Sequence, residues 1–445
     1  MGTLPSAQAL MGVSLGFHIV YAALGIGLPL FLLMAEGLSI KRGDELYHQL
    51  ARRWARTAGL LFAIGAVSGT MLSFELGLLW PEFMRFAGGV IGAPFALEGF
   101  AFFTEAIFLG LYLYGERRLS RKAQFLVTIP IAVASAISAV FIISANAWMN
   151  TPAGFRVANG MPVDVNPFKA MFNPSMPYET VHGTLASYVA TALALGGVYA
   201  FAMLRGQRTD YNRRALSLAT TVGAIVLPLM LITGHLSARF VAHEEPAKLA
   251  AMESLFDTTK GAPMLLGGWP DPATGQTKLA VSIPKALSLL GFENPNATVT
   301  GLNAFPGDRR PNPRLVHTFF DLMVLSFFVM VIALAWYWWH RWRRAETPPG
   351  NGLLRALVAA SPFGFIALQS GWMVTEFGRQ PWIIHGVMVV AEGVTPRAGI
   401  NLVFLVFGLV YIALTIGLLW LLVDGRLIGR PHRRPAEGGT GLVHP

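Results

Sequence analysis

Long apolar runs alternate with short polar segments along almost the whole chain. A transmembrane helix needs roughly 20 consecutive apolar residues, and about nine runs meet this requirement. They lie near 12–36, 57–79, 94–115, 124–148, 183–204, 216–239, 316–339, 353–376 and 400–423. In lipid the backbone must satisfy its hydrogen bonds within each run, so we expect helices. The pattern predicts an all-α integral membrane protein with about nine transmembrane helices.

Basic residues are concentrated in alternate connections between these runs. KRGDELYHQLARRWAR, ERRLSRK, RGQRTDYNRR and RWRR follow the first, third, fifth and seventh runs, and GRLIGRPHRRP follows the ninth. The positive-inside rule therefore predicts that these connections are cytoplasmic, with the N-terminus outside and the C-terminus in the cytoplasm. We find no internal repeat of matched period, which argues against an inverted-repeat transporter.

The connection over 240–315 is much longer than the others. It is polar and contains the turn-rich stretches PDPATGQ and NPNATV. Loops of this length are usually functional or disordered. We therefore expect helices 1–6 over 1–239, an external loop over 240–315, helices 7–9 over 316–425, and a cytoplasmic tail over 426–445. The tail has too little apolar content to pack, so we expect it to be disordered.

Composition supports a membrane protein and excludes several kinds of site. The chain is 54% hydrophobic and only 13% charged, whereas soluble domains have about 25% charged residues. The net charge of +10 comes from clusters between apolar runs, which argues against nucleic acid as a partner. Cysteine is absent, which excludes disulfides, iron–sulfur clusters and thiolate ligands. A metal would have to be held by histidine, methionine or carboxylate.

Several polar side chains lie inside or at the edge of the apolar runs. Ionisable groups are costly in a membrane and are functional candidates by default. On the predicted topology most of the candidates fall in the outer half of the bilayer. They are His18, Glu98, Glu105, His182 and Glu376, together with Met323 as a thioether ligand.

Each candidate also has a simpler interpretation. A lone histidine on an apolar helix is usually a packing residue, and a methionine is usually part of the core. Glu98 and Glu105 are two helical turns apart and share one face, either as a structural polar seam or as a proton path. Glu376 and Arg379 could form an ordinary ion pair at the membrane edge.

Taken together, the same residues suggest haem. Histidine with methionine is a common axial pair in electron-transfer haems. Arg379 could pair with a haem propionate. Trp372 and Trp382 could flank a macrocycle, although tryptophans at this depth are also ordinary interface anchors.

Six stretches resemble subunit I of the cytochrome bd-type quinol oxidases over about residues 10–425. They are GWMVTEFGRQPW, GFHIVY, VHGTLASY, LMV, SANAWMN and KLAAME. The resemblance implies that His182 and Met323 bind a low-spin haem b. It also implies that His18 and Glu376 bind iron in two high-spin haems, which are b and d or b and b, with Arg379 beside the haem of Glu376.

The resemblance extends to the substrate and to proton supply. Lys248 and Glu253 in KLAAME correspond to quinol-binding residues, so the long loop would be a quinol loop in its short form. Asn146 lies in the matching SANAWMN stretch. Glu98 and Glu105 would end a proton path from the cytoplasm. The implied partners are membrane quinol, a second transmembrane subunit (subunit II) and often a small single-helix subunit, in the bacterial cytoplasmic (inner) membrane.

The implied function is a quinol oxidase that oxidises quinol at the outer face and reduces oxygen to water. The alternative is a bd-like haem protein that passes electrons to another acceptor. A transporter that uses intramembrane acids is a third hypothesis.

Three departures from the family pattern are visible. The spacing from Glu98 to Glu105 is seven residues instead of eight. Asp321 stands where the family has arginine, and Gln8 and Leu10 stand where the family has an arginine and a glutamine. Asp321 would lower the potential of the low-spin haem, unless it points to another face of the helix or is paired with His317, one turn earlier.

Overall fold

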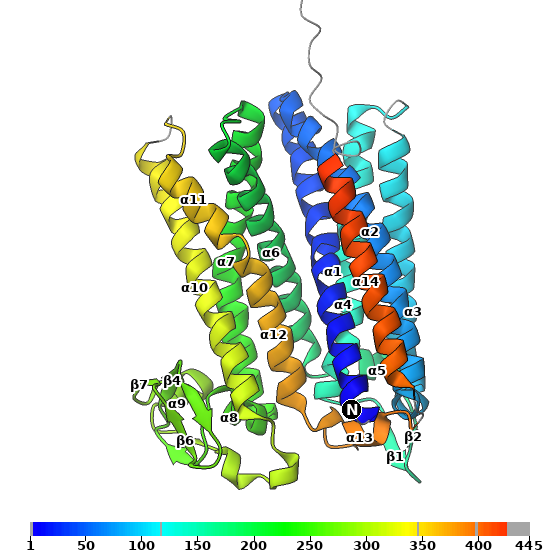
Figure 1. Ribbon diagram of the computed structural model, residues 1–445, viewed down its shortest axis with the longest axis vertical. Helices are drawn as coiled ribbons and strands as arrows, with labels where there is room; N and C mark the ends of the chain where they lie inside the picture. Colours follow the sequence, from blue (N-terminus) through cyan, green and yellow to red (C-terminus); the bar gives the residue numbers. More distant parts are fainter. Residues whose placement is uncertain (1–2, 116–117, 345–346, 397–398, 425–445) are drawn as a thin grey trace, which may run out of the picture.

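The protein is a bundle of long helices (Figure 1), seen in a computed structural model that describes residues 3–115, 118–344, 347–396 and 399–424. The long helices are α1 (Thr3–Arg42), α2 (Glu45–Leu79), α3 (Pro81–Tyr114), α4 (Arg121–Asn150), α6 (Met176–Leu204), α7 (Asp210–Glu244), α10 (Pro313–Arg343), α11 (Asn351–Ala360), α12 (Phe363–Arg379) and α14 (Ile400–Asp424). Within the described residues, eight segments are long and apolar enough to cross a membrane, with α11 and α12 counted as one segment. The ninth predicted run is α14, whose residues 402–417 form a further apolar helix.

The eighth predicted run is two helices and not one uninterrupted span. α11 ends at Ala360 and α12 begins at Phe363, with Pro362 at its N-cap. Proline lacks the N–H that a continuing helix needs and so contributes to the break, although Pro29, Pro94, Pro130 and Pro228 lie inside unbroken helices. After the break, α12 approaches α6 closely, because a Cβ added at Gly364 would lie 2.7 Å from the Cα of Ala190.

The helix ends near the basic connections are capped by short polar side chains. Asp44 accepts a hydrogen bond from the N–H of Leu46 at the start of α2, and Thr209 accepts one from the N–H of Asn212 at the start of α7. Such caps satisfy N–H groups that have no partner inside the helix. The basic connections therefore lie at defined helix ends.

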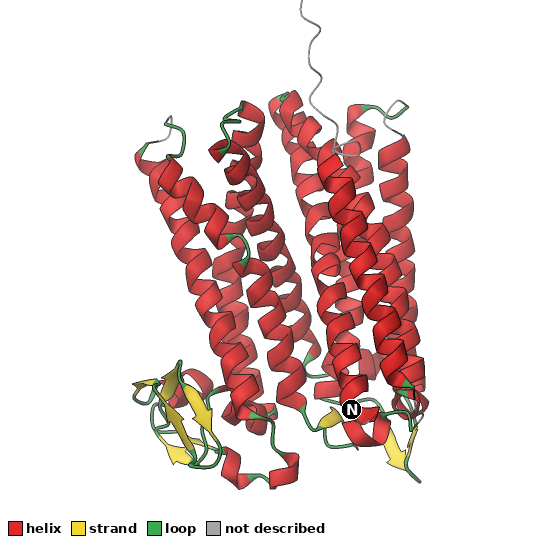
Figure 2. Cartoon of the chain, in the orientation of Figure 1, coloured by secondary structure: helices red, strands yellow, loops and turns green. Residues whose placement is uncertain are grey.

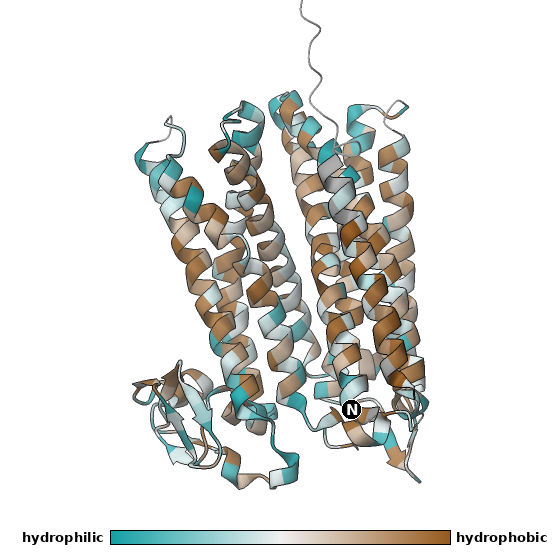
Figure 3. Cartoon of the chain, in the orientation of Figure 1, coloured by the Kyte–Doolittle hydropathy of each residue, from teal (hydrophilic) through white to brown (hydrophobic). Residues whose placement is uncertain are grey.

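The two ends of the bundle differ in character. The N-terminus lies at the end that carries the small sheets, and the connections after α1, α3, α6 and α10 lie at the other end (Figures 1 and 2). Hydrophilic residues collect at both ends and hydrophobic residues cover the length of the helices (Figure 3). Large apolar side chains such as Phe100, Phe103 and Ile107 on α3 are exposed, as expected for a surface in contact with lipid.

The long connection over 240–315 is folded. After α7 it forms α8 (Pro246–Met252), three two-stranded antiparallel sheets, α9 (Ala286–Phe292) and two short 3₁₀ helices at Leu302–Ala304 and Gly307–Arg309. The sheets pair β3 (Thr259–Lys260) with β8 (Thr298–Val299), β4 (Met264–Leu266) with β7 (Val281–Ile283), and β5 (Trp269–Asp271) with β6 (Gln276–Lys278). Leu249, Leu287 and Val299 are buried in a small core of its own.

Shorter elements close the same end of the bundle. They are β1 (Arg156–Ala158), β2 (Met161–Val163), α5 (Pro167–Met171), β9 (Trp382–Ile384), β10 (Met388–Val389) and α13 (Val390–Gly393). The predicted cytoplasmic tail 426–445 lies outside the described residues. The long connection thus lies at the end of the bundle that carries the N-terminus (Figure 1).

Candidate functional site

His18 on α1 and His182 on α6 are held in the same way. The Nδ1 atom of His18 lies 2.9 Å from the hydroxyl of Ser68, and that of His182 lies 3.1 Å from the hydroxyl of Thr233. Each hydroxyl donates its own hydrogen to a backbone carbonyl of its helix. It therefore accepts from the Nδ1–H of the histidine, which leaves Nε2 with a lone pair. This tautomer is the one that a metal ligand requires, with the other ring nitrogen fixed by a hydrogen bond.

A glycine lies beside each of these histidines and beside Met323. A Cβ at Gly69 would lie 3.1 Å from the Cε1 of His18, and a Cβ at Gly234 would lie 3.4 Å from the Cε1 of His182. A Cβ at Gly371 would lie 3.3 Å from the sulfur of Met323. A larger residue would crowd all three side chains, so the neighbouring helices leave room for them.

Glu376 and Arg379, three residues apart on α12, form an ion pair. The Nη2 atom of Arg379 donates to Oε2 of Glu376 at 2.6 Å, and the amide of Asn146 on α4 donates to Oε1 at 2.6 Å. Arg379 is almost fully buried, while about a quarter of the Glu376 side chain is exposed (27%). Two residues that were predicted separately, Asn146 and Glu376, are therefore in direct contact.

Asn150, at the end of α4, joins this ion pair to the long connection. Its side-chain carbonyl accepts from Arg379 at 3.3 Å and from the ammonium group of Lys248 at 3.2 Å. Its amide donates to Glu179 on α6 at 2.8 Å. Asn150 is completely buried. One amide thus connects the predicted quinol residue Lys248 to the predicted haem residue Arg379.

Lys248 is buried in α8 and has a charged partner at the N-cap of the same helix. It forms an ion pair with Glu245, and both side chains are only 5% exposed. A Cβ at Gly378 would lie 2.7 Å from the Cγ of Lys248, so the lysine stem lies directly against the end of α12. Buried charges persist only when paired and hydrogen-bonded, which Glu245 and Asn150 provide here.

Sequence reasoning missed three members of this network. Asn150, Glu179 and Glu245 lie in or beside the motifs SANAWMN, VHGTLASY and KLAAME, which were recognised by other residues. Glu245 is one helical turn before Lys248, a spacing that favours an ion pair and could have identified it. Asn150 and Glu179 gave no such signal, because their partners lie on other helices.

Glu253 follows α8 but does not share the surroundings of Lys248. It is buried, and the backbone N–H of Leu265 in β4 donates to it. Burial, followed by repulsion from Asp321, raises the pKa of Glu253 from 4.5 to about 8. Its Oε2 atom has no hydrogen-bond partner among the described residues. The two predicted quinol residues therefore offer different chemistry, a paired ammonium group and a carboxyl group that is protonated at neutral pH.

Asp321 is paired with His317 on α10. The Nε2 atom of His317 lies 3.2 Å from the Asp321 carboxylate and 3.1 Å from the carbonyl of Gly267, and Nδ1 lies 2.6 Å from the carbonyl of Met252. Asp321 is thus paired with His317, one of the possibilities that the sequence left open, and its effect on the haem potential stays a prediction. The same contacts tie α10 to the folded connection.

Glu98 and Glu105 lie on α3, separated from the residues of α12. Ser138 on α4 donates to Glu98 at 3.2 Å, and Glu105 is buried. The structure adds two acids that the sequence survey omitted, Glu75 on α2 and Glu36 on α1, both completely buried. They lie inside predicted spans, so the rule that selected Glu98 could have selected them.

The tryptophans near α12 have different surroundings. Trp372 is half-buried on α12, one turn before Glu376. The ring of Trp382 in β9 is covered by the guanidinium of Arg309, 4.5 Å from its centroid. Trp382 is therefore already stacked on a cation from the long connection.

No group of three or more His, Cys, Asp or Glu side chains in the described part of the chain is arranged to hold a bare metal ion. His18, His182, Met323 and Glu376 could each supply a single ligand. This donor set suits metal centres that bring most of their own ligands, as a porphyrin does.

Known proteins of one family are similar to this chain. The family model described as "Cytochrome bd terminal oxidase subunit I" matches residues 6–426. The putative cytochrome bd menaquinol oxidase subunit I of Bacillus subtilis is 36% identical over 428 residues, which cover 95% of this chain and 96% of the relative. Cytochrome bd ubiquinol oxidase subunit 1 of B. subtilis is 32% identical over 437 residues, covering 94% and 92%.

The fold agrees with a solved structure. The bd oxidase from Geobacillus thermodenitrificans superposes with a TM-score of 0.90 at 41% sequence identity, covering 95% of this chain and 98% of the compared chain. The helical architecture predicted from the apolar runs is therefore confirmed by both sequence and structure.

Proposed function

The chain belongs to the cytochrome bd terminal oxidase subunit I family, and we propose how its own residues hold the haems and the quinol. It is a multi-pass membrane subunit of a quinol oxidase that reduces oxygen, and the family implies haem cofactors. Haem, when bound, supplies the one-electron chemistry between quinol and oxygen and the site at which oxygen is reduced.

His182 and Met323 hold the low-spin haem b in this proposal, His18 is the ligand of one high-spin haem, and Glu376 is the ligand of the other. The tautomer fixed by Ser68 and Thr233 supports the histidine assignments, because it presents Nε2 for ligation.

Arg379 provides the second observation that fits a haem. Its Nε atom is buried without a hydrogen-bond partner among the described residues. A buried guanidinium N–H without an acceptor fits an anionic group such as a propionate, which is not part of the polypeptide. Arg379 therefore neutralises Glu376 and would also pair with a propionate of a bound haem.

Lys248 and Glu253 bind the quinol at the end of the bundle that carries the folded connection. Lys248 donates a hydrogen bond from a fixed position, while Glu253, in its ionised form, accepts the proton that the quinol hydroxyl releases as the quinol is oxidised. The contact from Lys248 through Asn150 to Arg379 supports this assignment, since it joins the quinol side to the haem side within one buried network.

Proton supply and assembly complete the proposal. Glu98 and Glu105 hold protons on their way to the oxygen site, and the arginine-rich end faces the cytoplasm. A second transmembrane subunit, and in some members a small single-helix subunit, completes the oxidase in the bacterial inner membrane. The two high-spin haems are b and d, or b and b.

The low-spin site provides the test of these assignments. We expect His182→Ala and Met323→Leu each to abolish the sharp low-spin α-band and quinol oxidation in the purified complex. Met330→Leu is the matched control, because Met330 is a buried methionine two turns further along the same helix. An α-band retained by both His182→Ala and Met323→Leu would overturn the ligand assignment.

A further inference from the structure

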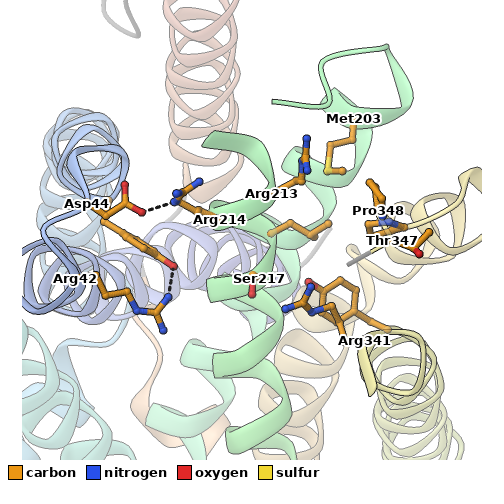
Figure 4. A pocket seen from close by; sticks show the side chains of 13 residues that line it. Arg42, Asp44, Met203, Arg213, Arg214, Ser217, Arg341, Thr347 and Pro348 are labelled. Atoms are coloured by element: carbon orange, nitrogen blue, oxygen red, sulfur yellow. Dashed lines mark hydrogen bonds and ion pairs between the residues drawn. The ribbon is translucent and has the colours of Figure 1, made fainter. Parts of the chain in front are cut away.

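A basic cavity opens at the end of the bundle opposite the long connection over 240–315. It measures about 320 Å³ and lies where the α1–α2, α6–α7 and α10–α11 connections meet. Arg42 and Asp44 stand on one side, Arg341, Thr347 and Pro348 on the other, and Ser217 of α7 lies between them (Figure 4). None of these residues belongs to the haem and quinol network described above.

The lining carries a large excess of positive charge. It contains the four arginines Arg42, Arg213, Arg214 and Arg341 and a single acid, Asp44. Asp44 accepts from the Nε atom of Arg214 at 2.5 Å. Like charges gathered in a partly enclosed space repel each other, so an anion bound between them would be stabilised.

Arg42 and Arg213 also have hydrogen-bonding capacity left over. Arg42 donates to the hydroxyl of Tyr47 at 3.3 Å, while Arg213 donates to the carbonyl of Arg208 at 3.2 Å and lies 3.5 Å from the carboxylate of Asp210. An arginine side chain has five N–H donors. These contacts leave each of the two side chains with donors for a ligand, and the planar fork of arginine matches the oxygens of a phosphate group.

The surroundings of the cavity place it at the level of lipid headgroups. Arg341 lies in the sequence of α10 between Trp339 and Trp342, whose side chains are exposed. The guanidinium carbon of Arg343 stacks on both rings, 4.7 Å and 5.1 Å from their centroids. Exposed tryptophans at the end of a spanning helix mark the membrane interface. The depth of the cavity is thus that of a phospholipid phosphate.

Part of the cavity lining is apolar. It includes Met203, Leu216 and Tyr337, whose side chains are almost fully buried. A free phosphate ion would use the arginines alone, whereas a lipid also brings apolar acyl chains. The combination of basic and apolar lining at the level of the headgroups favours a lipid.

We propose that this cavity binds the phosphate group of an anionic phospholipid from the leaflet at the arginine-rich end. Basic pockets between transmembrane helices on the cytoplasmic side are suited to such headgroups. The bound lipid would join three connections that come from separate parts of the chain. The phospholipid headgroup and inorganic phosphate both offer a tetrahedral phosphate oxyanion. The experiment below distinguishes these two ligands.

The test uses the purified oxidase complex, titrated by calorimetry with dihexanoyl phosphatidylglycerol, dihexanoyl phosphatidylcholine and inorganic phosphate. We expect the anionic lipid to bind and to be displaced only weakly by phosphate, and the zwitterionic lipid not to bind. The variant Arg213→Gln/Arg341→Gln removes two charge-assisted contacts, each worth roughly tenfold in affinity. Binding of the anionic lipid should therefore weaken about a hundredfold.

The matched control is Arg118→Gln/Lys122→Gln, which removes two exposed cations at the same end of the bundle, outside the cavity. It should bind the anionic lipid as the unaltered complex does, and both variants should keep the haem spectrum. If the cavity variant loses that spectrum, Ser217→Glu, which places a carboxylate between the arginines, should block binding instead.

Equal affinity of the cavity variant and the control would overturn the proposal, as would failure of the unaltered complex to bind the anionic lipid. Inorganic phosphate that binds as tightly as the lipid would overturn the lipid assignment and identify a soluble anion as the ligand.

Discussion

Glu253 gives the sharpest prediction, because its surroundings fix its protonation state. The carboxyl group is buried, and burial raises its pKa from 4.5 to about 8. Glu253→Gln replaces the protonated carboxyl group by a neutral group of the same shape. At pH below about 8 the two proteins should therefore carry the same charge at this position.

The sign of the pH effect follows from linkage. The unfolded chain ionises Glu253 above pH 4.5, whereas the folded chain keeps the proton up to about pH 8, so folding takes up a proton in this window. Stability must then fall as pH rises from 4.5 to 8 and level off above it. A pKa rise from 4.5 to about 8 corresponds to about 5 kcal/mol. This is the upper limit of the stability that the unaltered protein loses across this pH range through Glu253. The glutamine variant has no ionisable group at this position and should not lose it.

The assay compares apparent unfolding temperatures of the purified complexes between pH 5.5 and 8.5. The unaltered protein should lose stability across this range and Glu253→Gln should lose much less. Asp308→Asn, an exposed acid in the same connection, is the control and should follow the unaltered protein.

Quinol turnover should show the same ionisation. If Glu253 accepts the quinol proton, turnover of the unaltered enzyme rises with pH toward about 8, and Glu253→Gln is slow and insensitive to pH in that range. Parallel stability curves and parallel turnover profiles for the two proteins would refute the reasoning.

Two further predictions concern the quinol side and the topology. Gly378→Ala should lower quinol turnover severalfold with all haem bands retained, because its Cβ would lie 2.7 Å from the Cγ of the buried Lys248; unchanged turnover would show that the lysine can move. Cysteines at the exposed positions Lys122 and Ala273 should react with a membrane-impermeant thiol reagent from opposite sides of the membrane, and labelling from one side would contradict the topology.

The helices were largely predictable from the sequence because lipid imposes one local rule on each of them. A run of about 20 apolar residues must be helical in the membrane, and the basic connections mark alternate ends. The break in the eighth run also had a local signal, Pro362, which was not used. The folded connection could not be predicted, because its strands pair over distances that no local pattern specifies, such as Thr259–Lys260 with Thr298–Val299.

The candidate site was predictable only residue by residue. The sequence identified Glu376, Arg379 and Lys248 as candidates, but their link through Asn150 requires α4, α8 and α12 to meet in space. The pairing of Asp321 with His317 was one of the possibilities that the sequence predicted, since the residues are one helical turn apart. Hydrogen bonds between helices are therefore what the sequence alone leaves unspecified.

The central claim is that this chain carries the haems and the quinol chemistry of an oxygen-reducing oxidase. The most direct measurement combines a reduced-minus-oxidised spectrum of the purified complex with an oxygen-electrode trace after quinol is added. The account predicts a low-spin haem b band together with high-spin haem features, and oxygen uptake that starts with quinol. A haem-containing complex that oxidises quinol only with an acceptor other than oxygen would contradict it.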